Sequence, residues 1–138
     1  VAHDSLPDFG KRLAAIAEFA KRPEAAALAA ANKRIGNILK KSGTEAAASV
    51  DPLLFQETAE RGLWAALSQT EAALVPKLAV RDYVGVLQSL ATLREPVDAF
   101  FDGVMVNADD MKVRGNRLAM LRKLAAQFNA VGDIAVLA

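Results

Sequence analysis

The sequence predicts an all-α fold, a helical bundle of about five to six helices in a single domain covering residues 1–138. Alanine and leucine dominate the composition, while β-branched residues are few and scattered, which favours helices over strands. Apolar residues recur every three or four positions, the spacing of one helix face. With 53% hydrophobic and 24% charged residues, a chain of this length can bury a core, so a disordered chain is excluded.

Prolines, glycines and capping residues divide the chain into helix-length segments. Pro23 suits a first helical turn, and Gly43 suits a helix end. Asp51 precedes a proline and is predicted to cap the third helix, which should break near Pro76. Asp110 is predicted to cap the last helix, after which the apolar residues 134–137 should pack on the bundle. The predicted helices span residues 7–20, 23–41, 51–74, 80–94, 96–104 and 110–132.

Charge is unevenly distributed although the net charge is only +1. Basic and acidic side chains number 8 and 5 in residues 1–50, 4 and 10 in residues 51–110, and 5 and 1 in residues 111–138. If the two basic ends meet in space, they would form one basic surface suited to a polyanion.

Several function classes lack the residues they need. There is no cysteine, and the only histidine is His3, so thiolate metal sites, zinc sites and histidine-based triads are excluded. No phosphate loop or G-x-G-x-x-G motif is present, and Asp109 and Asp110 have no third ligand at a metal-binding spacing. No catalytic residue is therefore assigned. No apolar run approaches the roughly 20 residues that span a bilayer, so no membrane contact is expected.

One side of the second predicted helix gathers cations and an amide. The apolar side would carry Leu28, Ile35, Ile38 and Leu39. The opposite side and its flank, called the basic face below, carry Lys33, Arg34, Asn37, Lys40 and Lys41. Such a face could follow the phosphates of an unpaired RNA loop. The alternative is a solvated helix face with cations near its C-terminus, where the helix dipole favours them.

The last predicted helix opens with a second polar group. The side of this helix that should face the core forms an apolar stripe that includes Leu118. Arg114 lies one turn before Leu118 on the same stripe, so it should lie at the mouth of the core or pair with a carboxylate. We expect a structural role for Arg114. Its partner should be Asp98, Asp102 or Asp109 from the neighbouring segment, or backbone carbonyls. Arg117 should lie at the edge of the stripe. Lys112 and Asn116 should face outward, which makes them better candidates for RNA contact.

Two further features of this region need an explanation. Gly115 costs roughly 1 kcal/mol inside a helix relative to alanine. A close backbone approach by RNA or by another helix would explain it, as would a frayed first turn. Phe100 and Phe101 are adjacent, so both cannot face one core. One of them is therefore expected to be exposed or to pack on a missing domain.

Within residues 96–124, the segment Phe-Phe-Asp is followed by Met-Val-Asn, an acidic pair and a helix that opens with Arg-Gly-Asn-Arg-Leu. This stretch resembles the C-terminal end of the beta subunit of bacterial glycine–tRNA ligase, a DALR-type anticodon-binding domain. A second block, residues 31–41, resembles the same family in the expected order. The four-residue motif that names the domain falls on Met111, Lys112, Val113 and Arg114, where only the arginine is kept. The matching positions are Asp98, Phe100, Phe101, Asp102, Val104, Met105, Val106, Asn107, Asp109, Asp110, Arg114, Asn116, Arg117 and Leu118.

The resemblance implies a helical tRNA-binding module in the cytoplasm. It implies a glycine-specific tRNA as partner, together with the rest of the beta subunit and the alpha subunit of the ligase. ATP and Mg²⁺ would serve the whole enzyme, with no cofactor in this segment. Because the chain starts at Val1, we expect it to be a piece excised from the C-terminal end of a longer subunit. The candidate RNA contacts are the basic face together with Lys112, Arg114, Asn116 and Arg117. The alternative is a helical protein–protein interaction domain with no RNA role.

Overall fold

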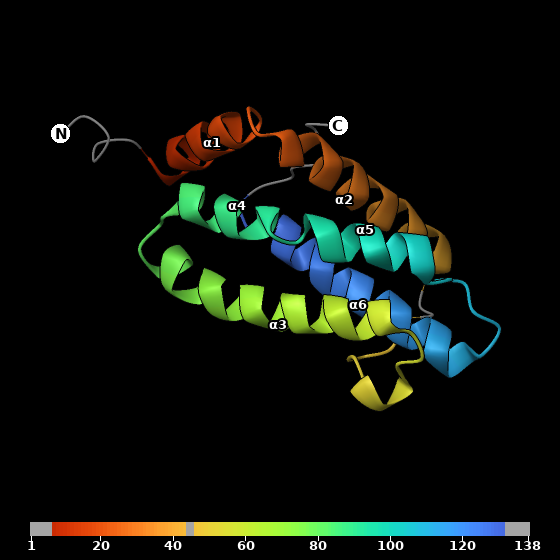
Figure 1. Ribbon diagram of the computed structural model, residues 1–138. Coiled ribbons are helices and arrows are strands. Elements are labelled where there is room, and N and C mark those ends of the chain that lie inside the picture. The colour runs from red at the N-terminus through yellow and green to blue at the C-terminus, as the bar shows by residue number, and fades with distance from the viewer. Residues whose placement is uncertain (1–6, 44–45, 132–138) are drawn as a thin grey trace.

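The computed structural model describes residues 7–43 and 46–131 and confirms the predicted all-α fold (Figure 1). Residues 134–137, expected to pack on the bundle, lie outside the described part. No helix within that part is long and apolar enough to cross a membrane. The elements are α1 (Asp8–Phe19), α2 (Pro23–Ser42), the 3₁₀ helix η2 (Pro52–Leu54), α3 (Thr58–Ala79), α4 (Tyr83–Ala91), α5 (Arg94–Gly103) and α6 (Met111–Phe128).

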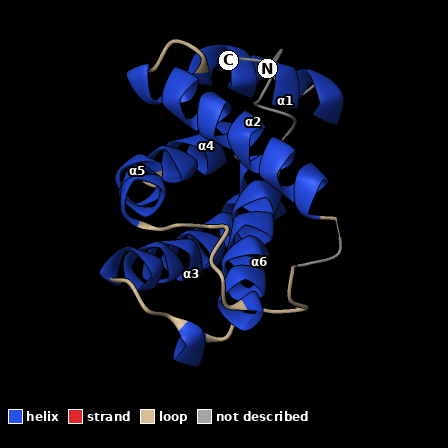
Figure 2. Cartoon of the chain, turned by 90° about the vertical axis from the view of Figure 1, so that its right-hand side faces the viewer, coloured by secondary structure: helices blue, strands red, loops and turns tan. Residues whose placement is uncertain are grey.

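The helices form a layered bundle. α4 and α5 follow one another in a row between α2 and α3, and α6 passes behind this row (Figure 1). α2 and α3 each pack against α4, α5 and α6, while α1 packs on α4. The view turned by 90° shows the segment after α5 leading to the start of α6 (Figure 2).

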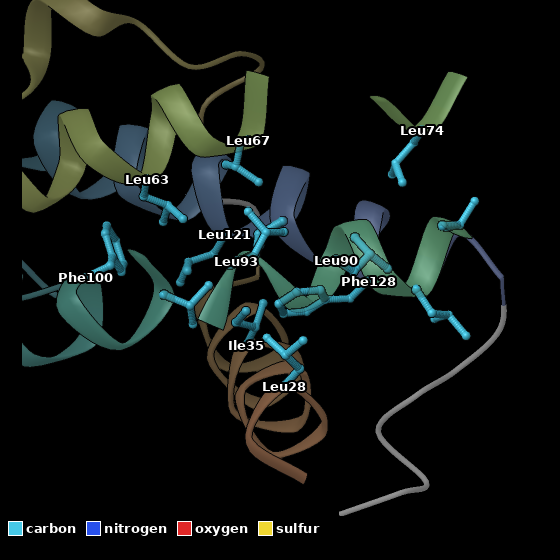
Figure 3. Packing of buried hydrophobic residues seen from close by; sticks show 14 of the residues in the cluster. Leu28, Ile35, Leu63, Leu67, Leu74, Leu90, Leu93, Phe100, Leu121 and Phe128 are labelled. Atoms are coloured by element: carbon cyan, nitrogen blue, oxygen red, sulfur yellow. The ribbon is translucent and has the colours of Figure 1, made fainter. Parts of the chain in front are cut away.

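The core collects apolar side chains from all six α-helices. Leu28 and Ile35 of α2 point toward Leu121 and Phe128 of α6, with Leu93 between them (Figure 3). Each of these side chains is almost completely buried. A fully buried leucine or phenylalanine contributes roughly 1.5–3 kcal/mol of transfer free energy. The packing therefore fixes how α2 and α6 lie against each other.

Several helix boundaries agree with the sequence-based predictions. Pro23 occupies the first turn of α2, and Gly43 follows its last turn with φ of 61°, a left-handed conformation that favours glycine. The side chain of Asp110 accepts hydrogen bonds from the backbone N–H groups of Lys112 and Val113, which confirms its role as the cap of α6.

The predicted third helix has different bounds. Asp51 caps the short η2 instead, and α3 begins at Thr58. A reciprocal capping box between Glu57 and Glu60 fixes that start. α3 also continues through Pro76 to Ala79. Pro76 is exposed and close to the helix end, so water can replace the one backbone hydrogen bond that the proline removes.

The predicted fourth and fifth helices also begin and end elsewhere. α4 starts at Tyr83, because the side chain of Asp82 accepts from the backbone N–H of Gly85. A β-carbon at Gly85 would lie 2.2 Å from the Asp82 carboxylate, so this cap requires glycine. α5 starts at Arg94, two residues before Pro96. Pro96 is tolerated because backbone N–H groups in a first helical turn have no intrahelical partner.

Candidate RNA-binding site

A cavity of about 520 Å³ lies between α2, the end of α5, the segment 104–107 and the start of α6. α2 and α6 pack together, so basic side chains from the two ends of the chain meet here. Arg34 and Lys41 come from α2, and Arg114 comes from α6. The lining residues of this α2–α6 cavity are Arg34, Ile38, Lys41, Ser42, Phe101, Val104, Met105, Val106, Asn107, Arg114 and Leu118.

Phe101 and Arg34 form one wall of the cavity. The guanidinium carbon of Arg34 lies over the Phe101 ring, 4.2 Å from its centre. Phe101 is half-buried and packs edge-on against the buried ring of Phe100, with centroids 5.7 Å apart. The two adjacent phenylalanines therefore face different environments, as their spacing predicts: Phe100 lies in the core, and Phe101 lies in the cavity wall. The partner of Phe101 is an arginine of the same chain.

The basic face of α2 continues from this cavity along the helix. A second hollow of about 420 Å³ is lined by Ala30, Lys33, Arg34, Asn37, Ile38 and Lys41. It shares Arg34, Ile38 and Lys41 with the cavity. Lys33, Arg34, Asn37, Lys40 and Lys41 are all exposed, as their helical spacing predicts. A chain of phosphates could therefore run along α2 and end at the cavity.

Arg114 is half-buried and lines the cavity from α6. Its Nη1 donates to the side-chain oxygen of Asn107 at 3.3 Å. Asn107 belongs to the segment between α5 and α6. Arg114 thus lies at the mouth of the core, which is one of the placements that the sequence predicts. Lys112, two residues earlier, is exposed, as predicted.

The expected outward orientation of Asn116 is wrong, because the side chain is completely buried. Its Oδ1 accepts from the backbone N–H of Asp51 at 2.6 Å, and its Nδ2 donates to the Asp51 carbonyl at 3.0 Å. The segment before η2 covers this side of α6, and Ala47 donates a backbone hydrogen bond to the Gly115 carbonyl at 2.9 Å. Asn116 therefore anchors a neighbouring segment and does not present its amide to solvent.

Arg117 is also buried, although its spacing suggests the edge of the stripe. Its Nη2 lies 3.0 Å from Oε1 of the buried Glu60, and its Nη1 donates to the Met105 carbonyl at 2.5 Å. Burial alone would raise the pKa of Glu60. Hydrogen bonds from Arg117 and from the backbone N–H groups of Gln56 and Glu57 outweigh burial and lower that pKa. The buried arginine of α6 is therefore Arg117, where the sequence pattern favours Arg114.

Two residues of the cavity wall are matching positions of the family resemblance, but the sequence does not predict a role in the site for either. Met105 is 72% exposed and Asn107 is exposed, both in the segment between α5 and α6. They lie in an irregular segment, so helical periodicity gives no indication of their positions. The Arg117 hydrogen bond to the Met105 carbonyl holds this segment against α6. A buried residue thus positions part of the cavity wall.

Comparison with known proteins decides the family. Residues 28–134 match the DALR anticodon binding domain. The chain belongs to this family. The match begins within α2 and includes every lining residue of the α2–α6 cavity. Arg114, which the resemblance puts at the last position of the four-residue motif, lines that cavity, while Met111 and Lys112 are exposed.

The chain is also similar to glycine–tRNA ligase beta subunits, and it spans about a fifth of their length. It is 52% identical to that of Methylobacillus flagellatus over 133 residues, which is 96% of this chain and 19% of the relative. It is 55% identical to that of Thiobacillus denitrificans over 128 residues, 93% of this chain and 18% of the relative. The Pseudomonas aeruginosa subunit is 51% identical over 130 residues, 94% of this chain and 19% of the relative.

Proposed function

We propose that this domain binds the anticodon loop of a glycine-specific tRNA, as the RNA-binding part of a glycine–tRNA ligase beta subunit. The observation that carries the proposal is the meeting of Arg34, Lys41 and Arg114 around one cavity, inside the segment that matches the anticodon-binding family. Unpaired loop bases expose their hydrogen-bonding edges to the protein, while basic side chains bind the phosphates of the RNA backbone.

The basic face of α2 supplies the backbone contacts in this proposal. Its cations are exposed along one side of the helix and lead to the cavity. Lys112 on the first turn of α6 adds a further exposed cation. Asn116 and Arg117 act indirectly, by holding the segments around α6 in place. Their side chains are occupied by Asp51, Glu60 and Met105.

The proposal places the domain within a larger assembly. By similarity to the beta subunits, its partners are the rest of that subunit and an alpha subunit, in the cytoplasm where bacterial tRNA is charged. ATP and Mg²⁺ would be used by the whole ligase when it attaches glycine to its tRNA. We assign this chain no step that uses them, since its contribution is to hold and select the tRNA.

Binding of glycine tRNA and of a non-cognate tRNA at two salt concentrations tests the proposal. We expect tighter binding of glycine tRNA, and affinity for both RNAs should fall as salt rises, because each phosphate contact releases condensed counterions. Failure to bind tRNA even at low salt would favour a helical protein–protein interaction domain. Equal affinity for both tRNAs would support binding to the RNA backbone but contradict the proposed specificity for glycine tRNA.

A further inference from the structure

We infer that the α2–α6 cavity holds one unpaired nucleotide of the RNA loop, with its base stacked on the Arg34 guanidinium and its phosphate beside Lys41. This inference rests on the proposed function, because it names the part of the RNA that enters the cavity. It adds a base-binding position and assigns individual residues to the base, its edge and its phosphate.

The size and lining of the cavity suit a nucleotide. Its volume of about 520 Å³ falls within the ~300–1,000 Å³ typical of small-ligand sites. Ile38, Val104 and Leu118 contribute apolar surface, while Arg34 and Lys41 contribute charge. A nucleotide likewise combines an apolar part and a charged part, because its base has apolar faces and its phosphate is an anion. A base within a duplex is stacked and paired, so only a splayed base can enter.

Arg34 is prepared for stacking before RNA arrives. Its guanidinium lies over Phe101, 4.2 Å from the ring centre, and Phe101 is in turn held by Phe100. The Arg34 side chain is exposed, so a base can reach the side of the guanidinium that faces away from the ring. Planar guanidinium groups stack on both aromatic rings and bases, whereas a lysine ammonium has no plane to offer.

Asn107 is placed to read the edge of the stacked base. Its Oδ1 accepts from Arg114, which directs the two N–H donors of its amide nitrogen elsewhere. Asn107 is exposed and lines the cavity, so those donors can reach acceptor atoms on a base edge. The site should therefore prefer a base that presents acceptors there, in addition to stacking, which tolerates any base.

The test uses an RNA hairpin with the sequence of a glycine-tRNA anticodon arm, in which each loop nucleotide is made abasic in turn. Binding is measured by fluorescence anisotropy with the wild-type chain, with Arg34→Lys and with Arg22→Lys. Arg22 is an exposed arginine at the opposite end of the same helix, so Arg22→Lys is the matched control. Both variants keep the net charge, and each replaces a planar guanidinium and its fork of N–H donors by an ammonium.

We expect one abasic position to weaken wild-type binding roughly tenfold, the size typical of a stacked base. Arg34→Lys should weaken binding of the intact hairpin by a similar factor, and the abasic penalty at that position should then nearly vanish. Arg22→Lys should leave both values at wild type. Asn107→Ala should reduce the discrimination among the four bases at the same position while leaving the stacking contribution.

Other outcomes overturn the inference in distinguishable ways. If every abasic penalty is the same in Arg34→Lys as in wild type, no base stacks on Arg34. Salt-dependent binding of the intact hairpin would then leave the proposed function standing. Unchanged base discrimination in Asn107→Ala would remove the edge reading. If the wild-type chain does not bind the intact hairpin at low salt, the inference and the proposed function both fall.

Discussion

At the scale of single residues, α6 separates two arginines that lie three positions apart in the sequence. Arg117 is buried with Glu60, whereas Arg114 is half-buried at the α2–α6 cavity. Removing one partner of a buried ion pair leaves an uncompensated charge, which is strongly destabilising. The two arginines should therefore respond differently to the same substitution.

Arg117→Ala should lower the free energy of unfolding by about 3–5 kcal/mol, because Glu60 stays buried without its partner. Arg114→Ala should cost less stability and weaken RNA binding directly, since this side chain lines the cavity. Urea denaturation of both variants, with the exposed Lys40→Ala as control, measures the difference. An unfolding midpoint for Arg117→Ala equal to that of the control would contradict the buried ion pair.

Glu60 also makes stability depend on pH. Its folded-state pKa lies below the ordinary 4.5, so the folded state holds the ionised form more strongly than the unfolded chain does. The stabilisation is complete above pH 4.5 and is lost as pH falls through the lowered folded-state pKa. We expect Glu60→Gln to flatten the decline in unfolding free energy in that acid range. Equal slopes for wild type and variant would show that another carboxylate is responsible.

At the scale of the elements, α2 combines a core side with an exposed basic face. Leu28 and Ile35 are buried against α6, while Lys33 and Lys40 are exposed. Substitutions on the exposed side should therefore change RNA binding without changing the packing of the helix.

Lys33→Glu combined with Lys40→Glu should weaken tRNA binding and flatten its salt dependence, because fewer counterions are released. Lys21→Glu combined with Arg94→Glu changes the net charge equally and is the control, since both positions are exposed on other parts of the chain. Thermal unfolding should be nearly unchanged in both double variants. Equal loss of affinity in the two would indicate a general effect of net charge and leave α2 without a specific role.

Helix periodicity predicted much of this arrangement but not all of it. It identified the six helical regions and the basic face, because each depends on spacing within one segment. The periodicity of α6 predicts that Asn116 faces solvent, whereas the structure buries it beneath the segment before η2. The spacing of residues within α6 carries no information about a segment that packs on the helix from elsewhere in the chain. Gly115 was the available signal: the close backbone approach it suggested is made by Ala47 of the same chain.

The cavity itself depends on contacts between distant segments. Arg34 and Phe101 are 67 positions apart, so no local pattern could predict that they stack. The resemblance to a known family marked Phe101 and Asn107 as matching positions without giving their geometry. Packing between α2, α5 and α6 then determines which of these matching positions line the cavity and which, such as Asn116, hold the structure together.

At the scale of the whole molecule, the chain spans 18–19% of the beta subunits it resembles and carries no nucleotide-binding motif. Activation of an amino acid requires groups that bind ATP and stabilise its reacting phosphate. Within the described residues, the polar side chains of the α2–α6 cavity are three cations, the amide of Asn107 and the hydroxyl of Ser42, an arrangement suited to holding RNA.

The purified chain alone should therefore neither activate glycine nor charge tRNA. Glycine-dependent exchange of pyrophosphate into ATP measures the first step, and attachment of labelled glycine to tRNA measures the second. A preparation of the same chain that binds glycine tRNA is the required control, because it shows that the domain is folded and active in binding. If that preparation supports glycine-dependent exchange above a no-enzyme blank, catalytic groups exist that neither the motifs nor the described side chains reveal, and the assignment as a binding domain alone is wrong.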